Sequence, residues 1–293
     1  MTITVCVPDE RFAAALEGLA VRVVTSLDPP ADTEFLVPIY MAGPVPAATL
    51  AALPRLKVVQ LLSAGYESWR SVLPAGVTLC NARGVHGAST AELAVGGLIA
   101  VLRDLPRFAE QQRTATWERH RGDTLDGASV LVLGAGDIGA RVAGAVSALG
   151  ADVTMVGRTA RDGIRTLADV GALLPYQQAV VVALPLTPAT AHLLDAQFLA
   201  ALPDGAVVVN VARGAIVDTG ALLAELRRGR LRAFLDVTDP EPLPAGHPLW
   251  HAPNLLLTPH VGGGTTGWER RARSLVRAQV GRYLAGEPLV NEV

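Results

Sequence analysis

The chain has 293 residues, of which 50% are hydrophobic and 18% are charged, and this composition excludes an intrinsically disordered protein. The length allows two domains of ordinary size. The formal net charge of −2 gives no electrostatic basis for binding nucleic acid. The longest apolar run, residues 93–102, is about half of the ~20 residues that a membrane-spanning helix needs. We therefore expect a globular protein that binds neither nucleic acid nor a membrane.

The two cysteines, Cys6 and Cys80, lie in separate apolar segments. Two isolated cysteines provide neither a disulfide framework nor a metal site, so we interpret them as buried thiols. The N-terminus lacks the pattern of a secretory signal. These features favour a cytoplasmic protein without a bound metal.

Five short apolar segments in the first part of the chain are predicted to be strands. Their apolar residues run without alternation, which is typical of a parallel sheet that is buried on both faces. They lie at residues 2–7, 21–26, 34–40, 56–62 and 77–82. A capping-box pattern at residues 89–92 then predicts the start of an apolar helix that runs to about Arg103. The polar segment 107–126, which contains Trp117, is predicted to be an exposed arm or linker.

A second α/β series starts at residue 128 and is predicted to contain six strands. They lie at residues 128–134, 151–157, 179–185, 206–212, 231–237 and 254–259. The clearest helix between them, residues 220–229, ends on Gly229 in the position of a C′ glycine. Six strands joined by helical crossovers predict a doubly wound sheet. The last predicted helix, at about residues 266–285, lies beyond this series and is expected to return to the first domain.

A glycine-rich turn at residues 134–139 closes the first strand of this series and opens a helix, which is the context of the dinucleotide-binding fingerprint. The first glycine permits a tight turn, the second lets the backbone approach a pyrophosphate, and the third allows close packing of helix and strand. The N-terminus of the helix supplies free amides and a positive dipole. The predicted cofactor contacts in this turn are Gly134, Gly136, Asp137, Ile138 and Gly139.

The predicted fold class is therefore α/β, with two doubly wound parallel-sheet domains. The first is a flavodoxin-like substrate domain made of residues 1–88 and 266–293. The second is a Rossmann dinucleotide-binding domain made of residues 89–265.

The second strand of the Rossmann series ends without the acidic residue that would hold the ribose 2′-hydroxyl of NAD. Arg158, Thr159 and Arg161 follow that strand instead. Because a guanidinium group pairs well with a phosphate, this turn favours NADP(H), with NAD(H) as the alternative. In that alternative both arginines are solvated residues near the adenine.

Three polar residues follow the last three predicted strands in order: Arg213, Glu241 and His260. The carboxyl ends of parallel strands line one crevice, so these side chains are expected to face the same ligand. Reduction of a 2-oxo acid needs a cation for the carboxylate and keto oxygen, and a general acid for the developing alkoxide. A free imidazole titrates near pH ~6.5, and an adjacent carboxylate favours its protonated form.

With these motifs in this order, the chain resembles the D-isomer-specific 2-hydroxyacid dehydrogenase family over nearly its whole length. The turn at residues 157–161 is similar to the NADPH-preferring glyoxylate and hydroxypyruvate reductase branch. The resemblance implies reduction of a small 2-oxo acid to a D-2-hydroxy acid. In that reaction Arg213 would orient the substrate, His260 would be the acid/base, and Glu241 would pair with His260.

The resemblance also carries several backbone and pocket positions. Ala64 and Gly65, in the loop of residues 62–66, would hold the substrate carboxylate together with Arg213 and His260. Asp236 would hold the nicotinamide carboxamide, although Phe234 is bulkier than the residues usual before this Asp. The further cofactor contacts that it implies are Thr90, Leu184, Pro185, Thr190, Val211, Ala212, Asp236 and Gly262.

The helix at residues 93–102 and the arm that follows resemble the dimerisation region of the family, so a homodimer is implied, with Trp117 as an interface anchor. The sequence does not assign His86, Met41, Trp250 or Trp268. Each could line the substrate pocket, although packing in the core or at an interface is the simpler interpretation.

Two other functions stay open at this stage. One is oxidation of a different small anion, such as formate or phosphite, on the same scaffold. Ala64 stands where the phosphite enzymes of the family carry a lysine, which argues against phosphite. The other is a dinucleotide-sensing interaction protein like the corepressors built on this fold, for which the chain shows no long disordered tail.

Overall fold

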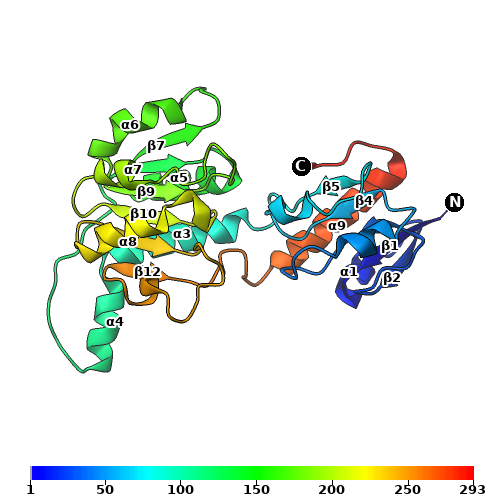
Figure 1. The fold of residues 1–293 in the computed structure, drawn as a ribbon, viewed down its shortest axis with the longest axis horizontal. Helices are drawn as coiled ribbons and strands as arrows, with labels where there is room; N and C mark the ends of the chain where they lie inside the picture. The colour runs from blue at the N-terminus through cyan, green and yellow to red at the C-terminus, as the bar shows by residue number, and fades with distance from the viewer. Residues whose placement is uncertain (1) are drawn as a thin grey trace. The chain divides into compact units, whose positions relative to one another are not determined.

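The computed structural model describes residues 2–293. The chain divides into two compact units (Figure 1), one formed by the residues up to His86 together with Gly264–Val293 and the other by Gly87–Gly263. We call them unit 1 and unit 2. Both boundaries lie two residues from the positions that the sequence suggested. Unit 1 is discontinuous because its last helix belongs to the C-terminal end of the chain.

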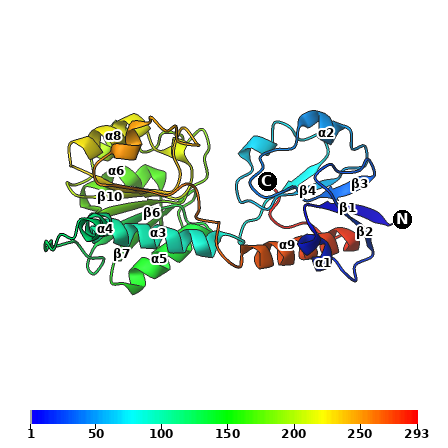
Figure 2. The same ribbon diagram turned by 90° about the horizontal axis from the view of Figure 1, so that it is seen from below.

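Unit 1 is a five-stranded parallel sheet in the order β2-β1-β3-β4-β5. Helices α1 and α9 cover one face, and α2 covers the other (Figure 2). The strands are β1 (Ile3–Val7), β2 (Val21–Thr25), β3 (Thr33–Leu36), β4 (Val58–Gln60) and β5 (Thr78–Cys80). The helices are α1 (Glu10–Ala15), α2 (Ala47–Ala51), the short η1 (Glu67–Trp69) and α9 (Trp268–Ala285). All five predicted strands are therefore confirmed, and the final helix packs on this sheet.

Unit 2 is a seven-stranded parallel sheet in the order β12-β11-β10-β9-β6-β7-β8. The strands are β6 (Ser129–Leu133), β7 (Asp152–Gly157), β8 (Ile164–Thr166), β9 (Ala179–Val182), β10 (Val207–Asn210), β11 (Arg232–Leu235) and β12 (Leu255–Leu257). The chain reverses direction across the sheet between β6 and β9, which is the point where doubly wound sheets bind ligands. The sequence missed β8, because its three residues include only one apolar side chain.

Two layers of helices cover this sheet (Figure 2). The helices α3 (Gly87–Leu102) and α5 (Asp137–Ala148) lie on one face, and α6 (Val170–Leu173), α7 (Ala196–Ala200) and α8 (Thr219–Arg227) lie on the other. Short 3-10 turns complete the unit, namely η2 (Leu167–Asp169), η3 (Leu174–Tyr176), η4 (Gly214–Ile216) and η5 (Pro248–His251). A side chain on Gly97 of α3 would overlap the ring of Phe234, so this glycine makes the room that the bulky Phe234 needs.

Two local predictions need correction, and one holds. The helix α3 begins at Gly87, so Ser89 lies in its first turn and does not cap it. The predicted arm is partly helical, because α4 (Leu105–Arg113) occupies its first third before an irregular segment. The predicted C′ glycine is confirmed, since Gly229 follows α8 with a φ of +70°.

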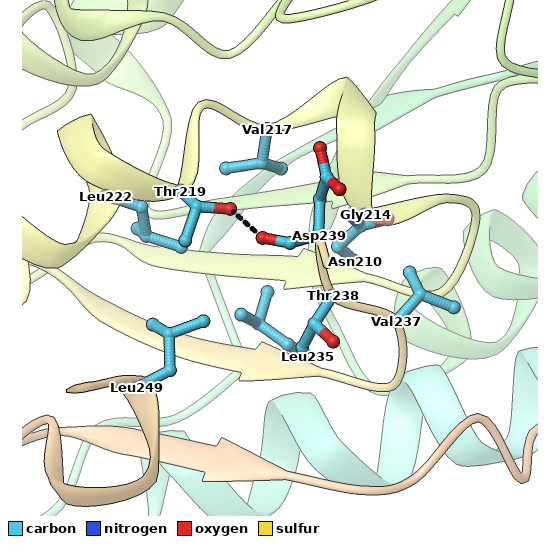
Figure 3. A pocket seen from close by; sticks show the side chains of 10 residues that line it. All are labelled: Asn210, Gly214, Val217, Thr219, Leu222, Leu235, Val237, Thr238, Asp239 and Leu249. Atoms are coloured by element: carbon cyan, nitrogen blue, oxygen red, sulfur yellow. Dashed lines mark hydrogen bonds between the residues drawn. The ribbon is translucent and has the colours of Figure 1, made fainter. Parts of the chain in front are cut away.

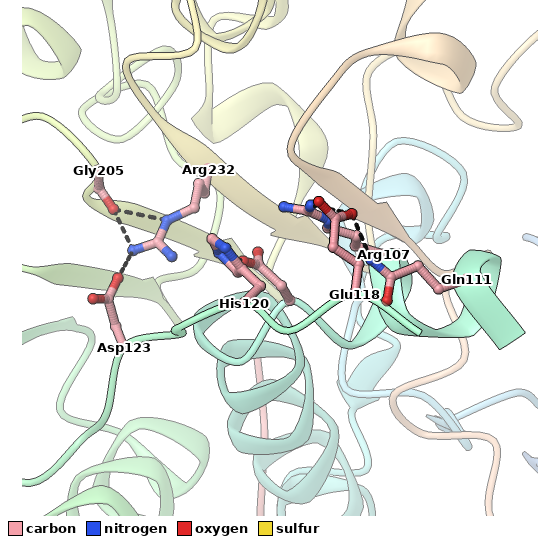
Figure 4. A network of polar contacts seen from close by, with 8 residues as sticks. Arg107, Gln111, Glu118, His120, Asp123, Gly205 and Arg232 are labelled. Atoms are coloured by element: carbon pink, nitrogen blue, oxygen red, sulfur yellow. Dashed lines mark hydrogen bonds and ion pairs between the residues drawn. The ribbon is translucent and has the colours of Figure 1, made fainter. Parts of the chain in front are cut away.

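Ion pairs fix the irregular part of the arm onto unit 2 (Figure 4). Glu118 accepts hydrogen bonds from Arg107 at 3.0 Å and from Gln111 at 3.3 Å, both on α4. Asp123 accepts one from Arg232 of β11 at 2.6 Å. Trp117, within this braced segment, is 92% exposed. Among the described residues no helix is both long and apolar enough to cross a membrane.

Candidate active site

The glycine-rich turn of unit 2 is shaped to receive a phosphate group. Gly134 has a φ of +122° and packs against the backbone of Ala183, and a side chain on Gly139 would overlap the Gly134 carbonyl. A Cβ on Gly136, in contrast, would meet no atom within 4 Å. Gly136 caps α5 without a side-chain hydrogen bond, which leaves the first amides of the helix available. These residues therefore fit the pyrophosphate of a dinucleotide.

Asp137 begins α5, and its carboxylate does not face the open side of the turn. One oxygen accepts a hydrogen bond from Nε of Arg141 at 2.8 Å, and the other is buried against Gly87 at the start of α3. The side chain of Asp137 is therefore held within the fold, and the contact of this residue with the cofactor stays a prediction. Ile138 packs against the core on the α3 side of the sheet.

The turn after β7 carries the cations that were expected near a 2′-phosphate. Arg158 and Thr159 are exposed, and Arg161 donates a long 3.3 Å hydrogen bond from Nη2 to the carbonyl of Ala135 in the glycine-rich turn. The short strand β8 adds Arg165, which sequence reasoning missed. The pKa of Asp169 lies below its usual value, because Thr166 donates two hydrogen bonds to its carboxylate and Arg165 adds a favourable charge.

The loop after β9 contains Leu184, Pro185 and Thr190. The hydroxyl of Thr190 donates to the Pro185 carbonyl at 2.7 Å and accepts from the Thr187 amide at 2.8 Å. Thr190 is 5% exposed and its side chain holds the loop together, and its contact with the cofactor stays a prediction. Leu184 packs partly against the core of the unit.

Arg213 follows β10 in a loop that Asn210 organises. The side chain of Asn210 is fully buried, donates to the Arg213 carbonyl at 2.9 Å and accepts from the Ala212 amide at 3.0 Å. Nη1 of Arg213 also donates to the Ala212 carbonyl at 2.6 Å. Val211 and Ala212, expected beside the nicotinamide, are 6% and 8% exposed. The sequence did not single out Asn210, because nothing in it distinguishes this residue from any other at the end of a strand.

The loops that carry Arg213 and Glu241 pack directly on one another (Figure 3). A side chain on Gly214 would overlap the backbone of Thr238, so only glycine lets these loops approach so closely. Thr219 Oγ1 donates to the Asp239 carbonyl at 3.0 Å and ties the second loop to α8. The cavity that remains between them is about 10 Å³, enough for about one water molecule.

Glu241 and His260 come together at the ends of β11 and β12. Nδ1 of His260 lies 2.5 Å from Oε1 of Glu241, and about a third of each side chain is exposed. A hydrogen bond to a carboxylate fixes which imidazole nitrogen carries the proton and how the ring is turned. Nε2 has no hydrogen-bond or ion-pair partner among the described residues and is left for a ligand.

Asp236 holds the segment that carries His260. One carboxylate oxygen accepts from the Val261 amide at 2.9 Å and from Thr258 Oγ1 at 2.6 Å, and the other accepts from the Gly262 amide at 2.9 Å. The carbonyl of Asp236 also accepts from the His260 amide at 2.8 Å. The sequence missed this clamp and assigned Asp236 to the cofactor alone.

Thr90, Asp236 and Gly262, all expected on the nicotinamide side, lie together in unit 2. A Cβ on Gly262 would lie 2.9 Å from Oδ2 of Asp236 and 3.3 Å from Cγ2 of Thr90. Ala64 and Gly65 belong to unit 1, where their loop follows β4. Trp250 is 47% exposed and donates to the Pro244 carbonyl, and Met41 is 59% exposed. Within residues 2–293 no cluster of His, Cys, Asp and Glu could hold a metal ion.

The switch point of the sheet and the uncapped glycine-rich turn are the features of a dinucleotide-binding α/β protein. Residues 95–262 match the profile of the D-isomer specific 2-hydroxyacid dehydrogenase NAD binding domain. The chain belongs to the D-isomer specific 2-hydroxyacid dehydrogenase family, which is a family of oxidoreductases.

Three known proteins illustrate the similarity. The D-3-phosphoglycerate dehydrogenase of Mycobacterium tuberculosis is 36% identical over 257 residues, which are 84% of this chain but 48% of that protein. The chain thus spans about half the length of the phosphoglycerate dehydrogenases that it matches. Glyoxylate/hydroxypyruvate reductase A of Serratia proteamaculans is 33% identical over 260 residues, covering 82% of both chains. A D-isomer specific 2-hydroxyacid dehydrogenase from Xanthobacter autotrophicus Py2, crystallised with NADPH and MES, has a TM-score of 0.85 at 33% identity, covering 100% of this chain and 98% of that one.

Proposed function

We propose that this protein is an NADPH-preferring reductase of small 2-oxo acids, with glyoxylate and hydroxypyruvate as the first candidates. Where the product is chiral, it is the D-2-hydroxy acid. The observation that carries the proposal is the 2.5 Å contact between His260 and Glu241, together with the packing of the Glu241 loop against the loop of Arg213. The similarity to the Serratia proteamaculans reductase supports this substrate class.

The side chains divide the work of the reaction between them. The nicotinamide, when bound, supplies the hydride to the carbonyl carbon. Arg213 binds the carboxylate and the keto oxygen, and the amides of Ala64 and Gly65 hold the carboxylate. Glu241 accepts a hydrogen bond from Nδ1–H of His260, and Nε2–H of the protonated ring donates its proton to the oxygen as negative charge develops there.

The preference for NADPH depends on the cations after β7. Arg158 and Thr159 are exposed, Arg161 reaches the glycine-rich turn, and no carboxylate stands at the end of β7 to repel a 2′-phosphate. Arg165 lies on the neighbouring strand β8, which pairs with β7. The NADPH complex of the Xanthobacter autotrophicus relative supports this assignment.

We also propose a homodimer in the cytoplasm. The braced arm presents Trp117 with 92% of its surface exposed, which is the kind of aromatic anchor that interfaces bury. The free thiols of Cys6 and Cys80 suit a reducing compartment.

Substitution of His260 tests the proposed chemistry. The wild-type protein should oxidise NADPH when glyoxylate or hydroxypyruvate is added. His260→Gln should lower kcat by about 10²–10⁴-fold, because the proton donor is lost, while the Kd for NADPH stays within about twofold. A large loss of NADPH affinity would show that His260 has been misassigned. A wild-type protein that binds NADPH but turns over no 2-oxo acid, formate or phosphite would be a dinucleotide sensor.

A further inference from the structure

The loop of unit 1 that follows β4 has its carbonyl groups turned inward. The Ser63 carbonyl accepts from the Ala82 amide at 2.8 Å, the Ala64 carbonyl from Asn81 Nδ2 at 2.9 Å, and the Gly65 carbonyl from Ser63 Oγ at 2.8 Å. Among the described residues, the amides of Ala64 and Gly65 have no hydrogen-bond partner. The loop therefore presents two donors on a backbone that is held from behind.

The Leu62 carbonyl, at the start of this loop, is held by His86. Nε2 of His86 lies 2.7 Å from this oxygen. A carbonyl can only accept, so Nε2 must carry the proton in this contact. Leu62 is 2% exposed and His86 is 6% exposed, so this hydrogen bond is shielded from water.

Packing fixes the ring of His86 in this position. The ring stacks on Tyr40, with centroids 5.2 Å apart and an interplanar angle of 14°, and lies 5.9 Å from the ring of Trp268. The preceding carbonyl, of Val85, accepts a 2.6 Å hydrogen bond from Nε of Arg271 on α9. His86 is therefore clamped by aromatic contacts on its ring and by α9 on its backbone.

We propose that His86 is a positioning residue, which sets the affinity of the Ala64 and Gly65 amides for a substrate carboxylate. This inference rests on the proposed function of the loop as the carboxylate-binding element. Without the Nε2 proton, the buried Leu62 carbonyl loses its partner, and rotation of the following peptides to recover one turns the amides away from the anion. The loop then binds carboxylates more weakly, while His260 and Arg213 keep their places in unit 2.

Two substitutions of His86 separate its hydrogen bond from its packing. His86→Phe keeps an aromatic ring against Tyr40 but removes the donor, whereas His86→Gln keeps an N–H group at about the same reach. His86→Phe should raise the KM for glyoxylate, and the Kd for oxalate in the presence of NADP⁺, by about tenfold, with kcat within about twofold. His86→Gln should restore most of the affinity. The matched control is His251→Gln, an exposed histidine of η5, which should leave both constants unchanged.

The possible results distinguish a failure of the His86 inference from a failure of the proposed reductase function. If wild type binds oxalate and His86→Phe binds it equally well, His86 does not position the loop, and the reductase proposal stands. If wild type binds oxalate but reduces no 2-oxo acid, the reductase proposal fails, and the oxalate Kd still tests His86. If wild type neither binds oxalate nor reduces a 2-oxo acid, both proposals are wrong. If His86→Phe fails to fold, Ser63→Ala provides a second test, because it removes the hydrogen bond to the Gly65 carbonyl. Ser63→Ala should then weaken oxalate binding, and unchanged binding would overturn the inference.

Discussion

Gly214 lies so close to Thr238 that no side chain fits between the two backbones, although they follow different strands of the sheet. Gly214 is the first residue of the turn η4, directly after Arg213, and Thr238 lies on the loop that leads to Glu241. This contact fixes the spacing of the loops that carry Arg213 and Glu241, the hydrogen-bond partner of His260. The geometry of the site is therefore set by backbone packing as well as by the polar side chains.

Gly214→Ala should separate these loops and lower kcat/KM for the 2-oxo acid by at least about tenfold. The overlap with a backbone that cannot move freely should also cost about 1–3 kcal/mol of stability. Thermal unfolding and steady-state kinetics measure both effects. Gly144→Ala is the control, because its Cβ would meet no atom within 4 Å on α5, and it should stabilise the protein by about 0.5–1 kcal/mol. Equal kinetic constants for Gly214→Ala and wild type would contradict the conclusion that the close approach of Gly214 and Thr238 sets the geometry of the site.

Arg158→Asp should weaken the binding of NADPH far more than the binding of NADH, because the substitution places a carboxylate beside the 2′-phosphate. We expect the Kd for NADPH to rise by at least about tenfold, and the Kd for NADH to change by less than about threefold. Titration of the cofactors by fluorescence gives both constants. Arg119→Asp, on the exposed arm, makes the same charge change elsewhere and should affect neither. Equal weakening of the two cofactors would rule out contact with the 2′-phosphate.

Trp117→Ala should shift a dimer towards the monomer. A central aromatic anchor typically contributes about 2 kcal/mol or more, which corresponds to a rise in the dimer Kd of at least about thirtyfold. Sedimentation at several concentrations gives this constant for wild type and variant. Tyr176→Ala removes another exposed aromatic residue, 73% exposed in unit 2, and should not change the assembly. If the wild-type protein sediments as a monomer, the arm does not form a dimer interface.

The two thiols should be unreactive in the native protein. Cys6 and Cys80 are fully buried, and burial raises the pKa of each to about 11. At pH 8 a thiol with this pKa is thiolate in only ~0.1% of molecules, and only the thiolate attacks a disulfide reagent. Labelling should therefore be slow below the unfolding transition and complete for both cysteines above it. Rapid labelling of one thiol in the folded protein would contradict its burial.

Long apolar strands and their order along the chain were predictable, because parallel strands buried on both faces must be rich in Val, Ile and Leu. The strand β8 was not, since only Ile164 of its three residues is apolar. The start of α3 was misplaced for a related reason. Gly87 and Ala88 carry no capping side chain, and the pattern at Ser89 fitted a motif that the packed helix does not use.

Arg213, Glu241 and His260 could be proposed from the sequence because each lies in the loop that follows a strand, whereas the residues that hold these loops could not. Asn210 and Asp236 act through hydrogen bonds to backbone groups, and no sequence pattern shows which amides a side chain will meet. His86 raised the same difficulty, since its partner Leu62 lies in another loop. Contacts to the backbone depend on the fold, so they become visible only when it is known.

The most direct test of the central claim is a grid of steady-state rates. It combines glyoxylate, hydroxypyruvate, pyruvate and a longer 2-oxo acid with NADPH and with NADH. We predict that kcat/KM is highest for glyoxylate or hydroxypyruvate with NADPH, and at least about tenfold lower with NADH. Equal turnover with both cofactors, or no turnover with any of the four acids, would contradict the claim that this protein is an NADPH-preferring reductase of small 2-oxo acids.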